Sequence, residues 1–158
     1  MINFNVMKYT TTVIIKGSRN EVIQKIASPE DMKHWQRGLK NYKLLEGTPG
    51  HKGATMELYY VMGKRKMMIT ETILENRFPD ELHASYTTKG VKNIQKNYFK
   101  EISPDTTEWL SESEFQFQGF GMKVMGWLMP NAFKKQSLKY MEDFKNFVEQ
   151  GISVAENP

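Results

Sequence analysis

The sequence predicts an α+β domain in which a curved, seven-stranded antiparallel sheet wraps around one long C-terminal helix. Between residues 131 and 149, apolar side chains recur at intervals of three and four residues, which places them on one stripe of a helix. Before this helix, residues 39–118 form alternating apolar and polar runs separated by turn residues, as expected of consecutive antiparallel strands. A broad aromatic helix face needs a broad apolar surface to pack against, and the sheet supplies that surface.

The predicted C-terminal helix is long enough to cross a small domain, because nineteen residues extend about 28 Å at ~1.5 Å per residue. Its apolar stripe consists of Phe133, Ser137, Tyr140, Met141, Phe144, Phe147 and Val148. Pro130 disfavours helix at the residue before it. Residues 122–129 are therefore predicted to form a separate or kinked helical turn.

The N-terminal part predicts one strand followed by two short helices. Residues 5–16 are rich in Thr, Val, Ile and Tyr, and Gly17 ends this strand. Ser18 and Glu21 fit a capping box at the start of the first short helix. The second helix is predicted to begin with Ser28 as its cap and the following proline at its first position.

The middle of the chain predicts six further strands with clear turn signals between them. A hairpin turn is expected at Gly63-Lys64, and Pro79, Gly90 and Pro104 mark three later turns. The predicted strands cover residues 39–46, 53–62, 66–75, 82–88, 93–102 and 106–118. The element order is therefore β-α-α-β-β-β-β-β-β-α.

Length and composition predict a single cytoplasmic domain. The 158 residues form one domain over 1–150, and residues 151–158 are expected to fray because they have no partner. The absence of cysteine excludes disulfides, thiolate metal sites and cysteine nucleophiles. No membrane span and no signal peptide are recognisable. A net charge of +4 is only mildly basic, so no nucleic-acid partner is expected. The sequence gives no indication of oligomeric state.

Four short segments follow one another in a recognisable order. Residues 14–26 join a strand to a short helix, and residues 31–35 end the second helix in a tryptophan. Thr106-Thr107-Glu108-Trp109 leads into the last strand, and residues 137–142, Ser-Leu-Lys-Tyr-Met-Glu, lie on the C-terminal helix. Together they resemble the START-like superfamily, also called SRPBCC or Bet v 1-like helix-grip proteins, over residues 6–149.

This resemblance implies a sheet that grips the long helix and leaves a cavity between them. Members bind hydrophobic ligands such as sterols, lipids, polyketides, plant hormones or quinones. Some members are cyclases or dehydratases, and others act as co-chaperone or toxin-like proteins. The fold alone does not choose among these functions.

Strand alternation and the resemblance together predict a mainly apolar ligand cavity, packed at its inner end and open near Pro130. Methionine adapts to irregular ligands, and tyrosine hydroxyls can orient a polar group. The predicted ligand-binding residues are Met56, Leu58, Tyr60, Met67, Ile69, Tyr86, Tyr98, Trp109, Phe115, Met125, Met129, Phe133 and Tyr140.

Glu71 is the one weak candidate for a catalytic residue. It shares strand parity with Met67 and Ile69, and a carboxyl among apolar neighbours has a raised pKa and can act as a general acid or base. Tyr86 or Tyr98 would be its partner. The alternative is that a strand bulge returns Glu71 to solvent, or that an arginine pairs with it.

The remaining polar residues predict neither a metal site nor a cofactor. His34, His51 and His83 are scattered without metal-ligand spacing, and His83 is expected to face outward. No phosphate-binding loop or nucleophile elbow occurs.

Three functions remain open, and the sequence favours the first. The leading interpretation is a non-enzymatic protein that binds a small hydrophobic or lipid-like molecule in the cavity. The second is a cyclase or dehydratase acting on a hydrophobic, polyketide-like substrate. The third is an interaction module like the Hsp90-activator branch, which would need an exposed apolar patch on the outer face of the sheet.

Overall fold

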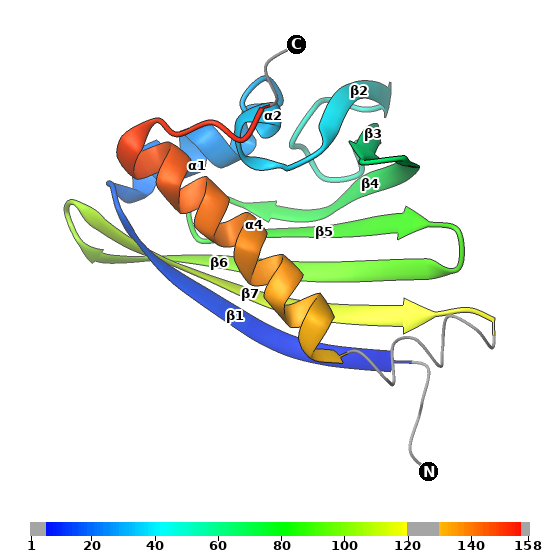
Figure 1. Cartoon of the computed structure of the whole chain (residues 1–158). Helices are drawn as coiled ribbons and strands as arrows, with labels where there is room; N and C mark the ends of the chain where they lie inside the picture. Colours follow the sequence, from blue (N-terminus) through cyan, green and yellow to red (C-terminus); the bar gives the residue numbers. More distant parts are fainter. Residues whose placement is uncertain (1–5, 120–129, 156–158) are drawn as a thin grey trace.

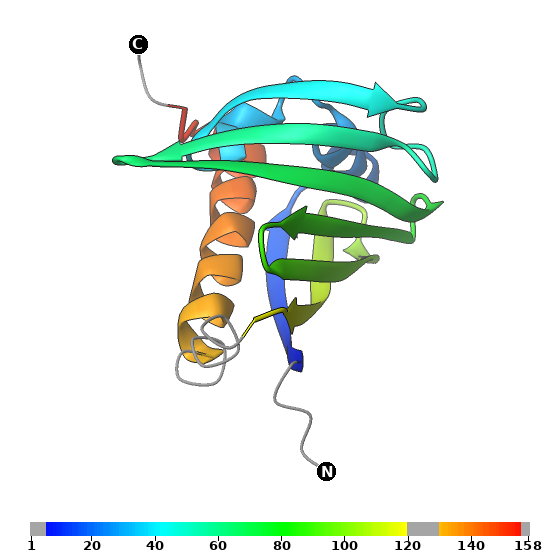
Figure 2. The same ribbon diagram turned by 90° about the vertical axis from the view of Figure 1, so that its right-hand side faces the viewer.

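In the computed structural model, seven antiparallel strands form one curved sheet, and a long helix lies across its concave face (Figures 1 and 2). The structure describes residues 6–119 and 130–155. Within them lie β1 (Val6–Lys16), α1 (Arg19–Ala27), α2 (Met32–Trp35), β2 (Leu39–Glu46), β3 (Thr55–Met62), β4 (Arg65–Arg77), β5 (Glu81–Thr88), β6 (Val91–Ser103), β7 (Thr106–Phe117) and α4 (Pro130–Gln150). The predicted fold class is confirmed.

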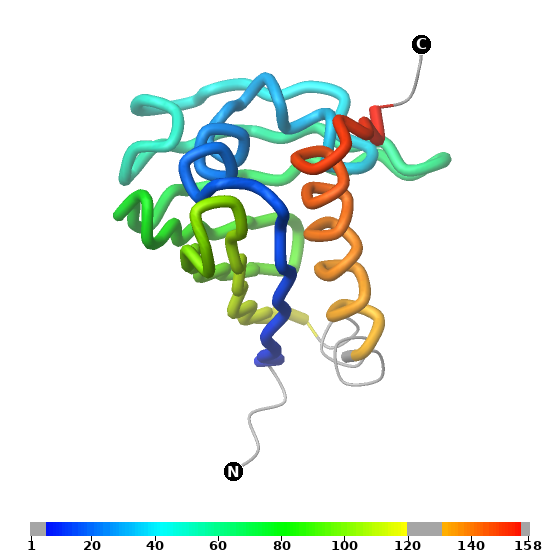
Figure 3. The backbone as a smooth tube through the Cα atoms, turned by 90° about the vertical axis from the view of Figure 1, so that its left-hand side faces the viewer, coloured from blue at the N-terminus to red at the C-terminus, as the bar shows by residue number. Residues whose placement is uncertain are grey.

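The strand order is β1-β7-β6-β5-β4-β3-β2, so β1 and β2, neighbours along the chain, lie at opposite edges of the sheet. The helices α1 and α2 span the distance between these edges, as the tube in Figure 3 shows. Predicted strand ends agree with the structure to within two residues. The segment 122–129, predicted as a separate helical turn, lies outside the described residues.

The first short helix begins as predicted, but the second begins later. The Ser18 hydroxyl accepts a hydrogen bond from the Glu21 N–H at 3.2 Å and caps α1. For α2 the cap residue is Asp31, so the predicted start at residue 29 is wrong. The Ser28 hydroxyl accepts the Asp31 N–H at 3.3 Å, and this contact closes a turn ahead of the helix.

The core is densest where the C-terminal half of α4 meets the sheet. The Phe144 side chain is fully buried, with its ring 5.1 Å from Trp35 and 5.3 Å from Trp109. Trp109 also stacks on Phe99 of β6 at 6.0 Å. These rings join α2, α4 and the sheet, as predicted for the packed end.

An ion pair joins the linker after α2 to a buried carboxylate on α4. The Arg37 guanidinium donates to both carboxylate oxygens of Asp143, at 2.6 and 3.1 Å. The Asp143 side chain is only 3% exposed, whereas that of Arg37 is 45% exposed. Such two-pronged pairs fix orientation as well as distance, so Arg37 holds the middle of α4 against the linker before β2.

The described part of the C-terminal tail, residues 151–155, has hydrogen-bond contacts with α2. Gly151 adopts a positive φ of 67° and ends α4. The chain then returns to α2, where the Val154 N–H donates to the His34 carbonyl at 2.9 Å. The His34 Nδ1 atom and the Ser153 hydroxyl are 2.8 Å apart. The tail therefore has a partner in α2.

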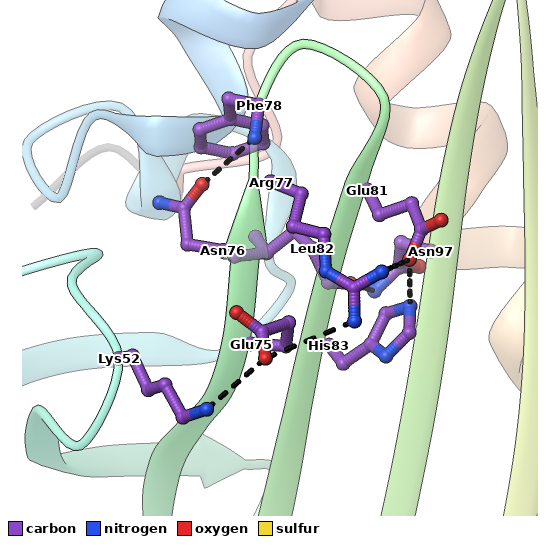
Figure 4. A network of polar contacts seen from close by, with 9 residues as sticks. All are labelled: Lys52, Glu75, Asn76, Arg77, Phe78, Glu81, Leu82, His83 and Asn97. Carbon is purple, nitrogen blue, oxygen red and sulfur yellow. Dashed lines mark hydrogen bonds and ion pairs between the residues drawn. The ribbon is translucent and has the colours of Figure 1, made fainter.

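At the β4–β5 turn, charged side chains gather on the convex face of the sheet (Figure 4). Glu75 is paired with Lys52 at 3.1 Å, and Glu81 lies 3.1 Å from His83 Nε2. A register shift in β4 between Ile73 and Glu75 sets this local facing. The prediction that His83 faces outward is confirmed.

Candidate functional site

The strand register aligns one row of residues across the concave face of the sheet. Consecutive cross-strand partners run from β2 at one edge to β1 at the other. In order they are Leu44, Met56, Glu71, Tyr86, Asn93, Phe115 and Met7. The row is apolar at both ends and polar in its middle three positions, on β4, β5 and β6.

Glu71 is the first of these three polar positions, and its side chain is half-buried. Burial raises the pKa of Glu71, and a hydrogen bond from Tyr86 opposes that rise. Burial, together with the charge of Glu71, also raises the pKa of the Tyr86 hydroxyl. The register places Glu71 between Met56 on β3 and Tyr86 on β5. Neither a bulge to solvent nor a paired arginine occurs at Glu71 in the described part of the chain.

Tyr60 extends the polar centre towards α2 and α4. Its hydroxyl donates to the side-chain oxygen of Gln36, which is itself buried. Burial raises the pKa of Tyr60, and the charges of Tyr140 on α4 and of Glu71 add to that effect. Tyr60 therefore lies in the electrostatic range of both the sheet carboxyl and the helix.

Asn93 is the site residue that the sequence analysis missed. Its side chain is 6% exposed, and its Oδ1 atom has no hydrogen-bond partner among the described residues. Most buried polar atoms in proteins are paired, so an unpaired acceptor needs an explanation. The available signal was the amides of Asn93, Gln95 and Asn97 at alternate positions of β6, which mark a polar inner face.

Tyr98 lies on the convex face, so the prediction that it lines the cavity or partners Glu71 is wrong. Its ring is 5.4 Å from His83 on the same outer surface. The facing of β6 is set by the neighbouring residues, because Phe99 packs on Trp109 and Asn97 accepts a hydrogen bond from the Trp109 indole at 2.9 Å. These two inward contacts require Tyr98 to point outward.

The other predicted ligand-binding residues separate into three groups. The largest set is one apolar cluster beside Glu71, made up of Met56, Leu58, Tyr60, Met67, Ile69 and Tyr86. Phe115 meets Phe133 of α4 edge to face at 5.0 Å, and Tyr140 is half-buried on the same helix. Trp109 belongs to the packed core instead. Met125 and Met129 lie outside the described residues.

Two hollows lie next to the described side chains. A small one of about 40 Å³ is bordered by Tyr60, Met62, Arg65 and Met67, at the edge of the apolar cluster. A larger hollow of about 340 Å³ lies over β1, β6 and β7. Its walls include Lys8, Lys96, Glu112 and Glu114, which do not suit an apolar ligand.

Within residues 6–119 and 130–155, no cluster of histidine or carboxylate side chains is arranged to hold a metal ion. The same part of the chain contains no helix that is both long and apolar enough to cross a membrane.

Solved structures with this architecture include that of Ara h 8.0201, with a TM-score of 0.72 and 10% sequence identity, over 90% of this chain and 97% of that chain. An aromatase/cyclase from a Streptomyces species matches with a TM-score of 0.71 and 10% identity over 92% and 98% of the two chains. Norcoclaurine synthase from Thalictrum flavum, in complex with dopamine and hydroxybenzaldehyde, matches with a TM-score of 0.67 and 12% sequence identity. The match covers 90% of this chain and 86% of that chain.

No protein-family model and no curated protein matches the sequence. The likeness to the solved structures therefore establishes the fold alone: this chain has the Bet v 1-like helix-grip fold that the sequence resemblance implied. Proteins with this fold include ligand-binding proteins and cyclases.

Proposed function

We propose that the protein binds a small, mainly apolar molecule between the concave face of the sheet and α4. The observation that carries the proposal is the row across β3 to β7, in which Glu71, Tyr86 and Asn93 interrupt an apolar surface. Ligand sites commonly combine an apolar wall with a few polar groups that orient the ligand. This row has that composition.

The energetics of the polar groups support a binding role. A half-buried carboxyl, Glu71, and a buried amide, Asn93, without a full set of partners cost free energy that an all-apolar core would avoid. In the packed end of the domain, around Phe144, the buried amide and carboxyl groups are paired, Asn97 with Trp109 and Asp143 with Arg37. The Trp35 indole N–H is the polar group there that has no partner among the described residues. The polar centre around Glu71 is consistent with selection for a ligand rather than for stability.

Native mass spectrometry of the purified protein, compared with its denatured mass, tests this proposal. We expect an additional small mass that is lost on denaturation, or a mass shift on addition of a naphthalene-sized apolar compound. A protein that stays free of any bound mass across a panel of such compounds would contradict the proposal.

Acid–base catalysis is the second candidate function, and the half-buried Glu71–Tyr86 pair, in which burial raises the pKa of Glu71, favours it. An ionised Glu71 would take a proton from the carbon next to a ligand carbonyl, leaving the electron pair on the carbonyl oxygen as an enolate. Return of a deuteron from heavy water would label that carbon. We therefore expect acetonaphthone to exchange its methyl protons faster with the wild-type protein than with Glu71→Gln. Equal rates for the two proteins would exclude this candidate.

The interaction-module alternative receives less support. The large apolar side chains exposed on the outer face include Ile14, Met68, Leu74 and Ile102, which come from three different strands. None of these four is a cross-strand partner of another. They do not form the continuous patch that such a module would need.

A further inference from the structure

The Glu71 carboxyl has no positively charged partner in the described part of the chain. Lysine and arginine side chains there pair with Glu75, Glu81, Glu114, Asp143 and other carboxylates, but none pairs with Glu71. Its polar neighbour on the adjacent strand is Tyr86, which lowers the pKa of Glu71 against the effect of burial. A carboxylate held in this way has lost water and gained no opposite charge.

Asn93 provides a second, independent indication that a hydrogen-bond donor is missing beside Tyr86. It follows Tyr86 in the row, so Glu71 and Asn93 flank Tyr86 on neighbouring strands. With strands about 4.8 Å apart, the two backbone positions are separated by roughly 10 Å. Their side chains lie on the same face of the sheet, on either side of Tyr86. The free Asn93 Oδ1 atom is an acceptor, as is an ionised Glu71. Both call for hydrogen-bond donors.

A protonated amine would satisfy both requirements. Its positive charge would neutralise an ionised Glu71. It also has up to three N–H donors for Glu71, Asn93 and further oxygens. The aromatic faces of Tyr86 and Tyr60 add a favourable surface for a cation. An alcohol would supply one donor without charge, a hydrocarbon would supply neither, and a carboxylate ligand would be repelled.

We propose that the ligand is an apolar amine whose ammonium group lies between Glu71 and Asn93, with its hydrocarbon body against Met56, Met67 and Ile69. This inference rests on the proposed function and specifies its ligand class. The apolar cluster accepts the body, and the polar centre of the row selects the charged end.

A matched series of three compounds tests the inference by isothermal titration calorimetry. Naphthylethylamine, naphthylethanol and ethylnaphthalene share one apolar body and differ only in the end group. We expect the amine to bind at least about tenfold more tightly than ethylnaphthalene, with the alcohol between them. Equal binding of all three, or an alcohol that binds as tightly as the amine, would overturn the inference while leaving the proposed function in place. Failure of all three to bind would overturn both.

Two glutamate variants locate the effect. Glu71→Gln preserves side-chain size and removes the charge, so the amine should lose its advantage over the alcohol. Glu57→Gln makes the same change one strand away on the opposite face, where Glu57 pairs in register with Lys43 and Thr70, and the advantage should remain. An amine preference that survives Glu71→Gln would contradict the assignment. Asn93→Leu offers a further check, because it should weaken the amine and the alcohol but not the hydrocarbon.

Discussion

Glu71 on β4 and Tyr86 on β5 are cross-strand partners on the concave face of the sheet, and each shifts the pKa of the other. The pair lies beside a dense apolar cluster, yet no described cation neutralises it. This combination makes the pair unfavourable for the folded protein when Glu71 is ionised. It also gives the site a measurable dependence on pH.

Replacing Glu71 should change how stability depends on pH. Burial raises the pKa of Glu71 above its ordinary value of 4.5, so the folded state holds this proton more tightly than the unfolded state. The contribution of Glu71 is therefore most favourable below about pH 4.5 and is lost as pH rises through the raised native pKa. Each unit of that rise corresponds to about 1.4 kcal/mol.

Urea unfolding at about pH 4 and about pH 8 measures this effect. Relative to the wild type, Glu71→Gln should be more stable at the higher pH than at the lower one. Glu75 and Glu114 have lowered pKa values and shift stability the opposite way, but both remain in the variant and cancel in the comparison. A difference between variant and wild type that does not change with pH would contradict the buried environment of Glu71.

Adjacent methionines on opposite faces should respond differently to a lysine. Met67 faces the apolar cluster on the concave side, whereas Met68 is 46% exposed on the convex side. Met67→Lys should weaken binding of naphthylethanol at least about tenfold, because it places a charge against the hydrocarbon body. Met68→Lys should leave the affinity unchanged. Similar affinities for the two variants, measured by calorimetry, would mean that the ligand does not bind on the concave face.

The Arg37–Asp143 pair should show strong coupling in a double-mutant cycle. Arg37→Met leaves the buried Asp143 carboxylate with only Lys139, 3.6 Å away, and should cost about 2 kcal/mol. Adding Asp143→Leu removes the stranded charge, so the double variant should lose less than the sum of the two single losses. Chemical denaturation of the four proteins measures the coupling. Simple additivity would mean that the pair contributes little.

Two aromatic residues one turn apart on α4 should differ in their importance to stability. Phe144 is fully buried between Trp35 and Trp109, so Phe144→Ala should cost about 3–5 kcal/mol. Phe147 is half-buried and stacks on His34 at the protein surface, and Phe147→Ala should cost clearly less. The midpoints of urea unfolding compare them. Equal losses would contradict the described packed end.

The fold followed from the sequence because its elements carry strong local signals. The helix stripe around Phe144, the Ser18 cap and the turn at Gly63 each have one physically reasonable interpretation. The second helix was placed too early because Ser28 and Pro29 match a helix start. In the structure the same serine closes a turn before Asp31. A serine hydroxyl accepts the N–H of the third residue after it both at the helix start (Ser18) and in this turn (Ser28), so this local pattern does not distinguish the two.

The site was predicted only in part, since facing on a strand depends on tertiary contacts. Glu71 and Tyr86 lie where the alternation of β4 and β5 is regular, outside the register shift between Ile73 and Glu75, and the register places both on the inner face. On β6 the inner positions are Asn93, Gln95 and Asn97, while the apolar Tyr98 faces outward. Alternation of hydrophobicity on β6 therefore predicts the wrong face for Tyr98. The contacts of Phe99 and Asn97 with Trp109 determine which side of β6 faces inward.

Methionine methyl resonances provide the most direct test of the central claim that the ligand lies on the concave face. Met56 and Met67 line the proposed site, and Met68 reports on the opposite face. In a titration of the isotope-labelled protein with naphthylethanol, we expect the methyl signals of Met56 and Met67 to shift and that of Met68 to stay in place. A shift at Met68 with no change at Met56 and Met67 would place the ligand elsewhere and contradict the account.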